Sequence, residues 1–183
     1  MRRSTARRSL PPLRAEQLHE LALRYVGRYA TTRAKLAAYL GRKLRERGWD
    51  GGGEPPVAQL VERFARSGLV DDAAFAMAKS RSLVERGYGA GRVRQALRAA
   101  GVDEEDGREA RELAAAEAAS AALRFARRRR IGPFATATAD PKTRERALAA
   151  MVRAGHAFEI ARRLVDCRPG EAIDAEELAA RFR

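Results

Sequence analysis

The stretch that decides the fold runs from Gly68 to Val102 and reads GLVDDAAFAMAKSRSLVERGYGAGRVRQALRAAGV. Its pattern predicts two helices, at about 71–86 and 90–100, separated by a glycine-rich turn. Asp71 or Asp72 can cap the first helix, because a short carboxylate there accepts the free N–H groups of the opening turn. Glycines end both helices, since glycine tolerates the positive φ that helix ends often need.

The second of these helices has an apolar face and a basic face. Val93, Leu97 and Ala100 recur at helical spacing and form one apolar stripe. The arginines of the same helix lie away from that stripe.

Three ordered motifs in this stretch point to a family. They are Gly-Leu-Val-Asp-Asp-x-x-Phe-Ala from Gly68, Lys-Ser-Arg from Lys79, and Gly-Tyr-Gly-x-x-Arg-Val-Arg-x-x-Leu-x-x-x-Gly-Val from Gly87. Together they resemble the middle repeat of the RecX family, the bacterial regulators of the RecA recombinase. Weaker similarity extends from about Leu21 to Asp166. The resemblance implies a protein built of three tandem three-helix repeats.

Helix-ending glycines indicate the same internal repeat. Gly48, Gly101 and Gly155 each follow an apolar helix and lie 53 and 54 residues apart. Repeats that bury their apolar faces partly against their neighbours give an extended array. We therefore predict an all-α, elongated array of three tandem three-helix repeats.

The predicted boundaries follow from the spacing of the helices and loops. They are a basic flexible arm at 1–15, repeat 1 at 16–69, repeat 2 at 70–116, repeat 3 at 117–168 and a polar C-terminal tail at 169–183, with one further helix possible at 174–182. The helix that closes repeat 2 is predicted to begin near Asp103, because acids cluster there and suit the positive end of the dipole.

The chain carries a strong excess of positive charge. Its 37 lysines and arginines outweigh 24 aspartates and glutamates, which gives a formal net charge of +13. Such an excess favours polyanionic partners, because neutralising phosphates releases counterions. The plainer alternative is a soluble helical protein whose genome favours arginine over lysine.

The candidate partner-binding residues are arginines on the predicted helices of repeats 2 and 3. They are Arg81, Arg86, Arg92, Arg94, Arg98, Arg127, Arg128, Arg129 and Arg130. Arginine is informative because its planar guanidinium pairs bidentately with phosphate or carboxylate. The alternative is a solvated face, and the four at 127–130 also suit the negative end of a helix dipole.

No pattern in the sequence is typical of an enzyme or a metal site. The histidines, His19 and His156, stand outside metal-ligand spacing, and Cys167 is the single cysteine. We therefore expect no catalytic residue, no metal and no cofactor. His156 is expected to shield a helix end, and Cys167 to be a small packed side chain.

Other chemical interpretations have simpler structural alternatives. Asp71-Asp72 resembles a metal pair but suits a helix cap. The glycines of Gly87-x-Gly-x-Gly resemble a phosphate cradle, but no strand precedes them, which favours a flexible interhelical turn. Tyr25, Tyr29 and Tyr39 can stack on nucleic-acid bases, although their helical spacing favours core packing.

The RecX resemblance implies a non-catalytic function. Proteins of this family bind RecA and its single-stranded DNA filament, and inhibit recombinase, ATPase and co-protease activities in DNA repair and the SOS response. We expect a monomer in the bacterial cytoplasm, without a membrane span and with weak direct DNA binding as a further possibility. The rival interpretation is a sequence-independent or helix-turn-helix-type DNA-binding protein, because helix pairs with an arginine-rich second helix fit it superficially.

Overall fold

The structure, a computed structural model, describes residues 11–180 of the 183-residue chain. Within that range the secondary structure is helical, apart from one isolated β-bridge between Leu13 and Trp49. The predicted all-α class is confirmed. The chain divides after Asp72 into two compact units, which are described separately below.

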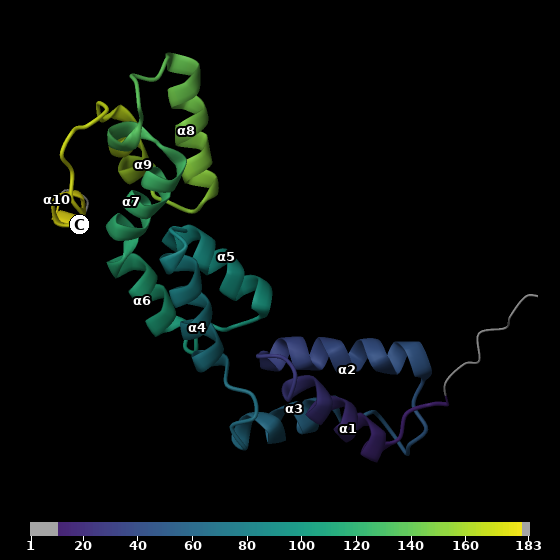
Figure 1. Cartoon of the computed structure of the whole chain (residues 1–183). Helices are drawn as coiled ribbons and strands as arrows, with labels where there is room; N and C mark the ends of the chain where they lie inside the picture. Colours follow the sequence, from purple (N-terminus) through teal and green to yellow (C-terminus); the bar gives the residue numbers. More distant parts are fainter. Residues whose placement is uncertain (1–10, 181–183) are drawn as a thin grey trace, which may run out of the picture. The chain divides into compact units, whose positions relative to one another are not determined.

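The first unit is a three-helix bundle. It contains α1 (Ala15–Val26), α2 (Arg33–Arg47) and α3 (Val57–Arg66) (Figure 1). Apolar side chains from all three helices meet in one core, made of Leu13, Leu18, Ala22, Leu36, Leu40, Leu60, Val61, Phe64 and Val70. The Thr32 hydroxyl caps α2 by accepting the N–H of Lys35 at 3.2 Å, as its non-helical φ and ψ allow.

Leu13 belongs to this core, although it was expected in a flexible arm. Its side chain is fully buried, its N–H donates to the carbonyl oxygen of Gly48 at 3.0 Å, and its carbonyl accepts the N–H of Asp50 at 2.8 Å. Arg14 adds an ion pair to Asp50. Residues 11–15 are therefore built into the first unit, whereas residues 1–10 of the expected arm lie outside the described residues.

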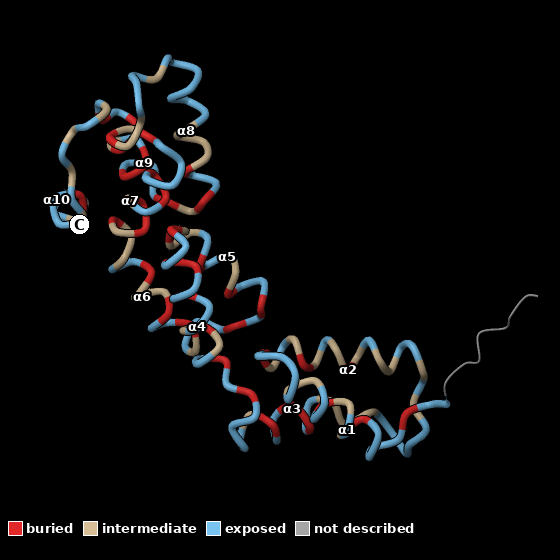
Figure 2. The backbone as a smooth tube through the Cα atoms, in the orientation of Figure 1, coloured by how far each residue is buried: buried red, intermediate tan, exposed pale blue. Residues whose placement is uncertain are grey.

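The second unit contains the remaining helices. They are α4 (Asp72–Glu85), α5 (Ala90–Ala100), α6 (Arg108–Ala116), α7 (Ala118–Arg129), the 3-10 turn η1 (Gly132–Phe134), α8 (Pro141–Arg153), α9 (Phe158–Asp166) and α10 (Ala175–Ala180). Buried positions recur along these helices at helical intervals (Figure 2). The unit holds two separate apolar cores among its described residues.

One of these cores joins α4, α5 and α6. It includes the predicted stripe of α5, Val93, Leu97 and Ala100, all buried. The fully buried hydroxyl of Ser80 donates to the carbonyl oxygen of Ala110 at 2.7 Å, which ties α4 to α6. This bond avoids the cost of about 1–3 kcal/mol that a buried hydroxyl without a partner incurs.

The other core joins α7, α8, α9 and α10. Phe125, Met151 and Leu164 lie at its centre. Leu178 of α10 is only 1% exposed and packs into the same core. The expected polar tail therefore contains a helix with a buried anchor, as far as its described residues go.

The glycines that indicated the repeat all have positive φ. Gly48, Gly101 and Gly155 have φ of +83°, +71° and +91°. At Gly101 the next N–H, from Val102, reaches back to the carbonyl oxygen of Leu97 at 3.1 Å and closes the helix end. The repeat boundaries given above remain predictions.

The glycine-rich turn between α4 and α5 is a packing surface. The N–H of Gly89 donates to Ala154 at 3.0 Å and the N–H of Gly91 donates to Gly155 at 2.9 Å. A Cβ on Gly89 would lie 2.3 Å from the carbonyl oxygen of Gly155. These N–H groups are used within the protein, so the turn is neither a phosphate cradle nor a loose hinge.

Helix α6, the third helix of the core shared with α4 and α5, begins later than expected. It was predicted from about Asp103, but α6 starts at Arg108 and turns precede it. The Asp103 carboxylate accepts the N–H of Asp106 at 2.8 Å, and the Arg111 guanidinium donates to the carbonyl oxygen of Glu104 at 2.9 Å. These local bonds satisfy the backbone in a turn, which competes with the helix.

Candidate functional site

The three candidate arginines of α5 lie on the solvent side of the helix. Arg92, Arg94 and Arg98 are exposed, while Val93 and Leu97 between them are fully buried. Arg94 and Arg98 are one turn apart and so share a face. Arg92 lies on another side and donates to the Gln95 side chain at 2.7 Å.

Of the next two candidates, Arg81 lies on α4 and Arg86 directly follows that helix, and their surroundings differ. Both are exposed. Arg86 donates to the carbonyl oxygen of Ser82 at 3.0 Å, and its guanidinium lies 5.6 Å from the centre of the Tyr88 ring. Arg81 lines a shallow groove of about 310 Å³ together with Arg124, Glu85 and Glu117. Carboxylates in this groove partly offset the positive charge of Arg81.

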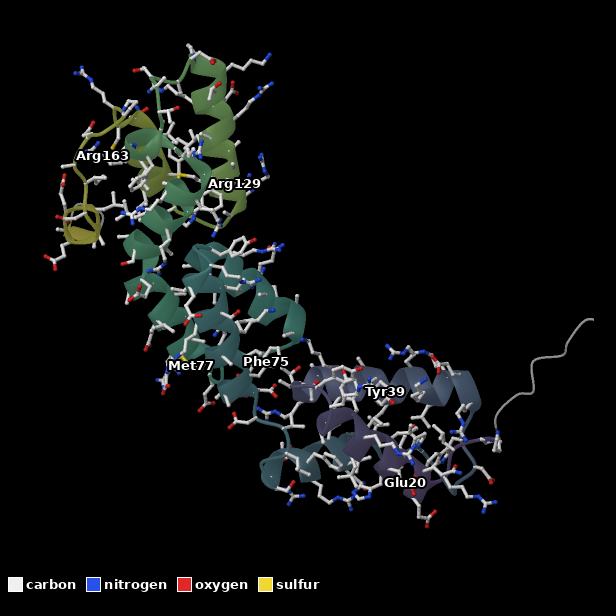
Figure 3. The ribbon with its side chains drawn as sticks, viewed as in Figure 1. Glu20, Tyr39, Phe75, Met77, Arg129 and Arg163 are labelled. Carbon is white, nitrogen blue, oxygen red and sulfur yellow. The ribbon has the colours of Figure 1, made fainter. Side chains whose placement is uncertain are left out.

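The arginines at the end of α7 combine exposure with local contacts. Arg127 to Arg130 are all exposed, and Arg129 projects from α7 in Figure 3. The guanidinium of Arg127 lies 5.0 Å from the Phe134 ring centre, and that of Arg129 lies 5.8 Å from the Phe125 ring centre. Arg130 closes the helix with φ of +53° and ψ of +49°, the left-handed region.

One long-range contact unites two of the candidate groups. The Arg128 guanidinium donates to the carbonyl oxygen of Arg86 at the end of α4. The structure therefore brings the α7 arginines to the end of α4. No hydrogen bond or ion pair between described residues links the α5 arginines to the other candidates.

His156 connects the glycine turns from inside the second unit. It is 6% exposed, its Nε2 lies 3.1 Å from the carbonyl oxygen of Gly87, and its ring meets Phe125 edge-on at 5.3 Å. Because a carbonyl only accepts, Nε2 carries the proton. Burial lowers the pKa of His156 to about 4, although the hydrogen bond to Gly87 acts in the opposite direction. The residue does cover a helix end, as predicted.

Cys167 is a packed thiol, as predicted. It is buried at the end of α9, and Arg163 donates to its Sγ at 2.9 Å. Burial raises the pKa of Cys167 to about 11, with Arg163 acting in the opposite direction. The thiol is therefore protonated at neutral pH, whereas a nucleophilic cysteine needs the thiolate.

Two kinds of site are absent from the described part of the chain. No group of three or more His, Cys, Asp or Glu side chains there is arranged to hold a metal ion. No helix of residues 11–180 is long and apolar enough to span a membrane.

A second cationic surface was not among the candidate sites. It lies in the first unit, where Arg24, Arg28, Arg42 and Lys43 surround the three tyrosines. The signal was present in the sequence, because cations flank Tyr25, Tyr29 and Tyr39 at helical spacing. Core packing was the interpretation given to these tyrosines; it fits half-buried Tyr25 and Tyr39 but not Tyr29, which is 51% exposed.

The fold and its surfaces define a class: a helical-repeat protein whose exposed arginines flank buried apolar stripes. A family model described as RecX, second three-helix domain, matches residues 71–110. The chain is 37% identical over 165 residues to "Regulatory protein RecX" of Myxococcus xanthus (strain DK1622), which covers 83% of this chain and 86% of that protein. The chain belongs to the RecX family of regulatory proteins.

A second relative agrees with that assignment, and two solved structures share the fold. "Regulatory protein RecX" of Mycobacterium sp. (strain KMS) is 43% identical over 96 residues, 51% of this chain and 48% of that protein. The crystal structure of RecX from Lactobacillus salivarius has a TM-score of 0.59 at 15% identity and covers 82% of this chain and 94% of its own. A second crystal structure, of regulatory protein RecX, has a TM-score of 0.56 at 22% identity, over 82% of this chain and 70% of its own. These structures support the fold.

Proposed function

We propose that this protein is a non-catalytic, monomeric regulator that binds the RecA filament on single-stranded DNA in the bacterial cytoplasm. Binding inhibits the recombinase, ATPase and co-protease activities of RecA. The observation that carries the proposal is the exposure of Arg81, Arg92, Arg94 and Arg98 on α4 and α5, within the residues that match the RecX family model.

These arginines can take part in binding without being needed for folding. Their helices bury Leu83, Val93 and Leu97, so the core between α4, α5 and α6 does not depend on the charges. Guanidinium groups pair with DNA phosphate or with acidic side chains of the filament. A regulator held at several such points blocks the addition of further RecA subunits.

The test is RecA ATPase activity on single-stranded DNA with increasing amounts of this protein. The double variant Arg92→Glu/Arg98→Glu should stay helical with an almost unchanged melting temperature, because exposed substitutions usually change stability by no more than about 0.5 kcal/mol. It should lose most of its inhibition, since charge reversal replaces attraction by repulsion.

The matched control is Arg146→Glu/Arg153→Glu on α8, which removes the same charge from two other exposed arginines. It should inhibit RecA almost as well as the unmodified protein. Full inhibition by the folded Arg92/Arg98 variant would move the site, with Arg127 to Arg130 as the next candidates. Strong binding to one duplex sequence, with no effect on RecA, would favour the DNA-binding rival.

A further inference from the structure

Three tyrosines form a continuous aromatic cluster between α1 and α2. The rings of Tyr25 and Tyr39 stack with centroids 4.2 Å apart and an angle of 13° between their planes. Tyr29 continues the cluster, with its ring centroid 5.4 Å from that of Tyr25. Figure 3 marks Tyr39 on α2 and Glu20 on α1, the two helices that carry the site.

Cations surround this aromatic cluster. Arg24, Arg28, Arg42 and Lys43 line, with the tyrosines, an open groove of about 540 Å³. The Arg28 guanidinium lies 5.7 Å from the centre of the Tyr29 ring, and that of Arg42 lies 5.5 Å from the centre of the Tyr39 ring. Such cation–π geometry keeps guanidinium groups beside the rings while their N–H groups remain available to a ligand.

The carboxylates nearby offset only part of this charge. Glu46 pairs with Lys43 at 2.7 Å and with Arg42 at 3.7 Å, and Glu20 pairs with Arg24 at 3.3 Å. Arg28 forms no ion pair with any acid in residues 11–180. The groove therefore keeps a net positive charge, with Arg28 as its least neutralised member.

Core packing does not account for the whole cluster. Tyr25 and Tyr39 are half-buried and pack against the core of the first unit. Tyr29 is 51% exposed and Arg28 is exposed, so these two contribute little to that core. Proteins that bind single-stranded nucleic acids commonly place an exposed aromatic ring beside an arginine. A base stacks on the ring, and the cation contacts a phosphate.

We propose that the groove between α1 and α2 binds single-stranded nucleic acid, with a base stacked on Tyr29 and phosphates held by Arg28 and Arg42. A duplex fits less well, because its base faces are already stacked. An acidic peptide would use the cations but leave the Tyr29 ring without a partner. This proposal goes beyond the regulation of RecA and needs no RecA.

The experiment measures binding of a fluorescently labelled oligothymidine to the full-length protein by anisotropy. Tyr29→Ala should weaken binding roughly 5- to 150-fold, the range that stacking of one base contributes. Tyr29→Phe keeps the ring and should bind like the unmodified protein. An abasic phosphodiester chain separates the two contacts: Tyr29→Ala should leave its binding unchanged, whereas Arg28→Gln should weaken both ligands.

Two further ligands complete the test. Oligouridine should bind with an affinity similar to that of oligothymidine, because stacking and phosphate contacts are common to DNA and RNA. Polyglutamate should bind Tyr29→Ala and the unmodified protein with equal affinity. Unchanged oligothymidine affinity in a folded Tyr29→Ala variant would overturn the proposal, as would equal losses for the abasic chain. Since no RecA is present, failure here leaves the Arg92/Arg98 experiment unaffected, and the reverse also holds.

Discussion

The N–H of Gly91 donates to the carbonyl oxygen of Gly155 at 2.9 Å, which joins the first turn of α5 directly to the turn between α8 and α9. Gly155 has φ of +91°, and a Cβ there would lie 2.2 Å from the backbone nitrogen of Arg92. Glycine is therefore required at Gly155 for space and conformation, and at Gly89 in the facing turn for space, since a Cβ on Gly89 would lie 2.3 Å from the Gly155 carbonyl oxygen.

Adding a methyl group at this contact should destabilise the protein. Gly89 has φ of −78°, so Gly89→Ala introduces no backbone strain, but its Cβ would meet the Gly155 carbonyl oxygen at 2.3 Å. We expect a loss of about 1–3 kcal/mol in the free energy of unfolding, measured by urea denaturation. Gly52→Ala is the control, because no atom lies near that site. Equal stability of both variants would contradict the packing described here.

His156 should make stability depend on pH. Its folded pKa of about 4 lies below the ordinary 6.5, so stability is complete above pH 6.5 and falls as the pH drops toward 4, where the unfolded chain takes up the proton first. Between pH 7 and pH 5 this effect amounts to about 2 kcal/mol. His156→Gln keeps a donor for Gly87 without a titrating group, so its free energy of unfolding should fall less over that range. If the free energy of unfolding depended on pH equally in His156→Gln and in the unmodified protein, His156 would not be the source of the dependence.

The left-handed residue at the end of α7 offers a stabilising substitution. Arg130 has φ of +53°, which costs energy for a residue with a Cβ. Arg130→Gly should raise the free energy of unfolding by roughly 0.5–1 kcal/mol. The neighbouring Arg129→Gly, inside the helix, should lower it by about 1 kcal/mol. A loss of stability in Arg130→Gly would show that its side chain matters more than the backbone strain.

The last described helix should contribute to the stability of the second unit. Leu178 is 1% exposed, so Leu178→Ala should cost about 2 kcal/mol or more, as large-to-small core substitutions do. Leu69→Ala is the matched control, because Leu69 is 50% exposed and its truncation should cost less than about 0.5 kcal/mol. Thermal unfolding followed by circular dichroism measures both. Equal melting temperatures for the two variants would mean that α10 is dispensable.

Much of the fold could be predicted because helices are determined locally. The buried stripe of α5 and the helix ends at Gly48, Gly101 and Gly155 follow from periodicity and from the conformational freedom of glycine. The burial of Leu13 and of Leu178 could not be predicted in this way, because each packs against residues distant in the chain. Leu13 is fixed by the segment after α2, and Leu178 by the core around α7, and neither partner can be inferred from the neighbouring residues.

The same distinction applies to the candidate sites. Exposure of Arg94 and Arg98 follows from their place opposite an apolar stripe, which the sequence displays. The contact of Arg128 with Arg86 crosses 42 residues and required the tertiary structure. For Tyr29, core packing was favoured over base stacking, because helical spacing shows which residues share a side of a helix, but not how far the neighbouring helix covers that side.

The main-chain contact between the two glycine turns has a mechanical consequence. A contact between side chains yields under load by rotation about χ angles, whereas two backbones in direct contact have no such rotation available. The first residues of α5 are therefore held more firmly against the turn between α8 and α9 than a side-chain contact would hold them. Arg92 directly follows Gly91, so its backbone is fixed by this contact. A cation with a fixed backbone loses less conformational entropy when it binds an anion.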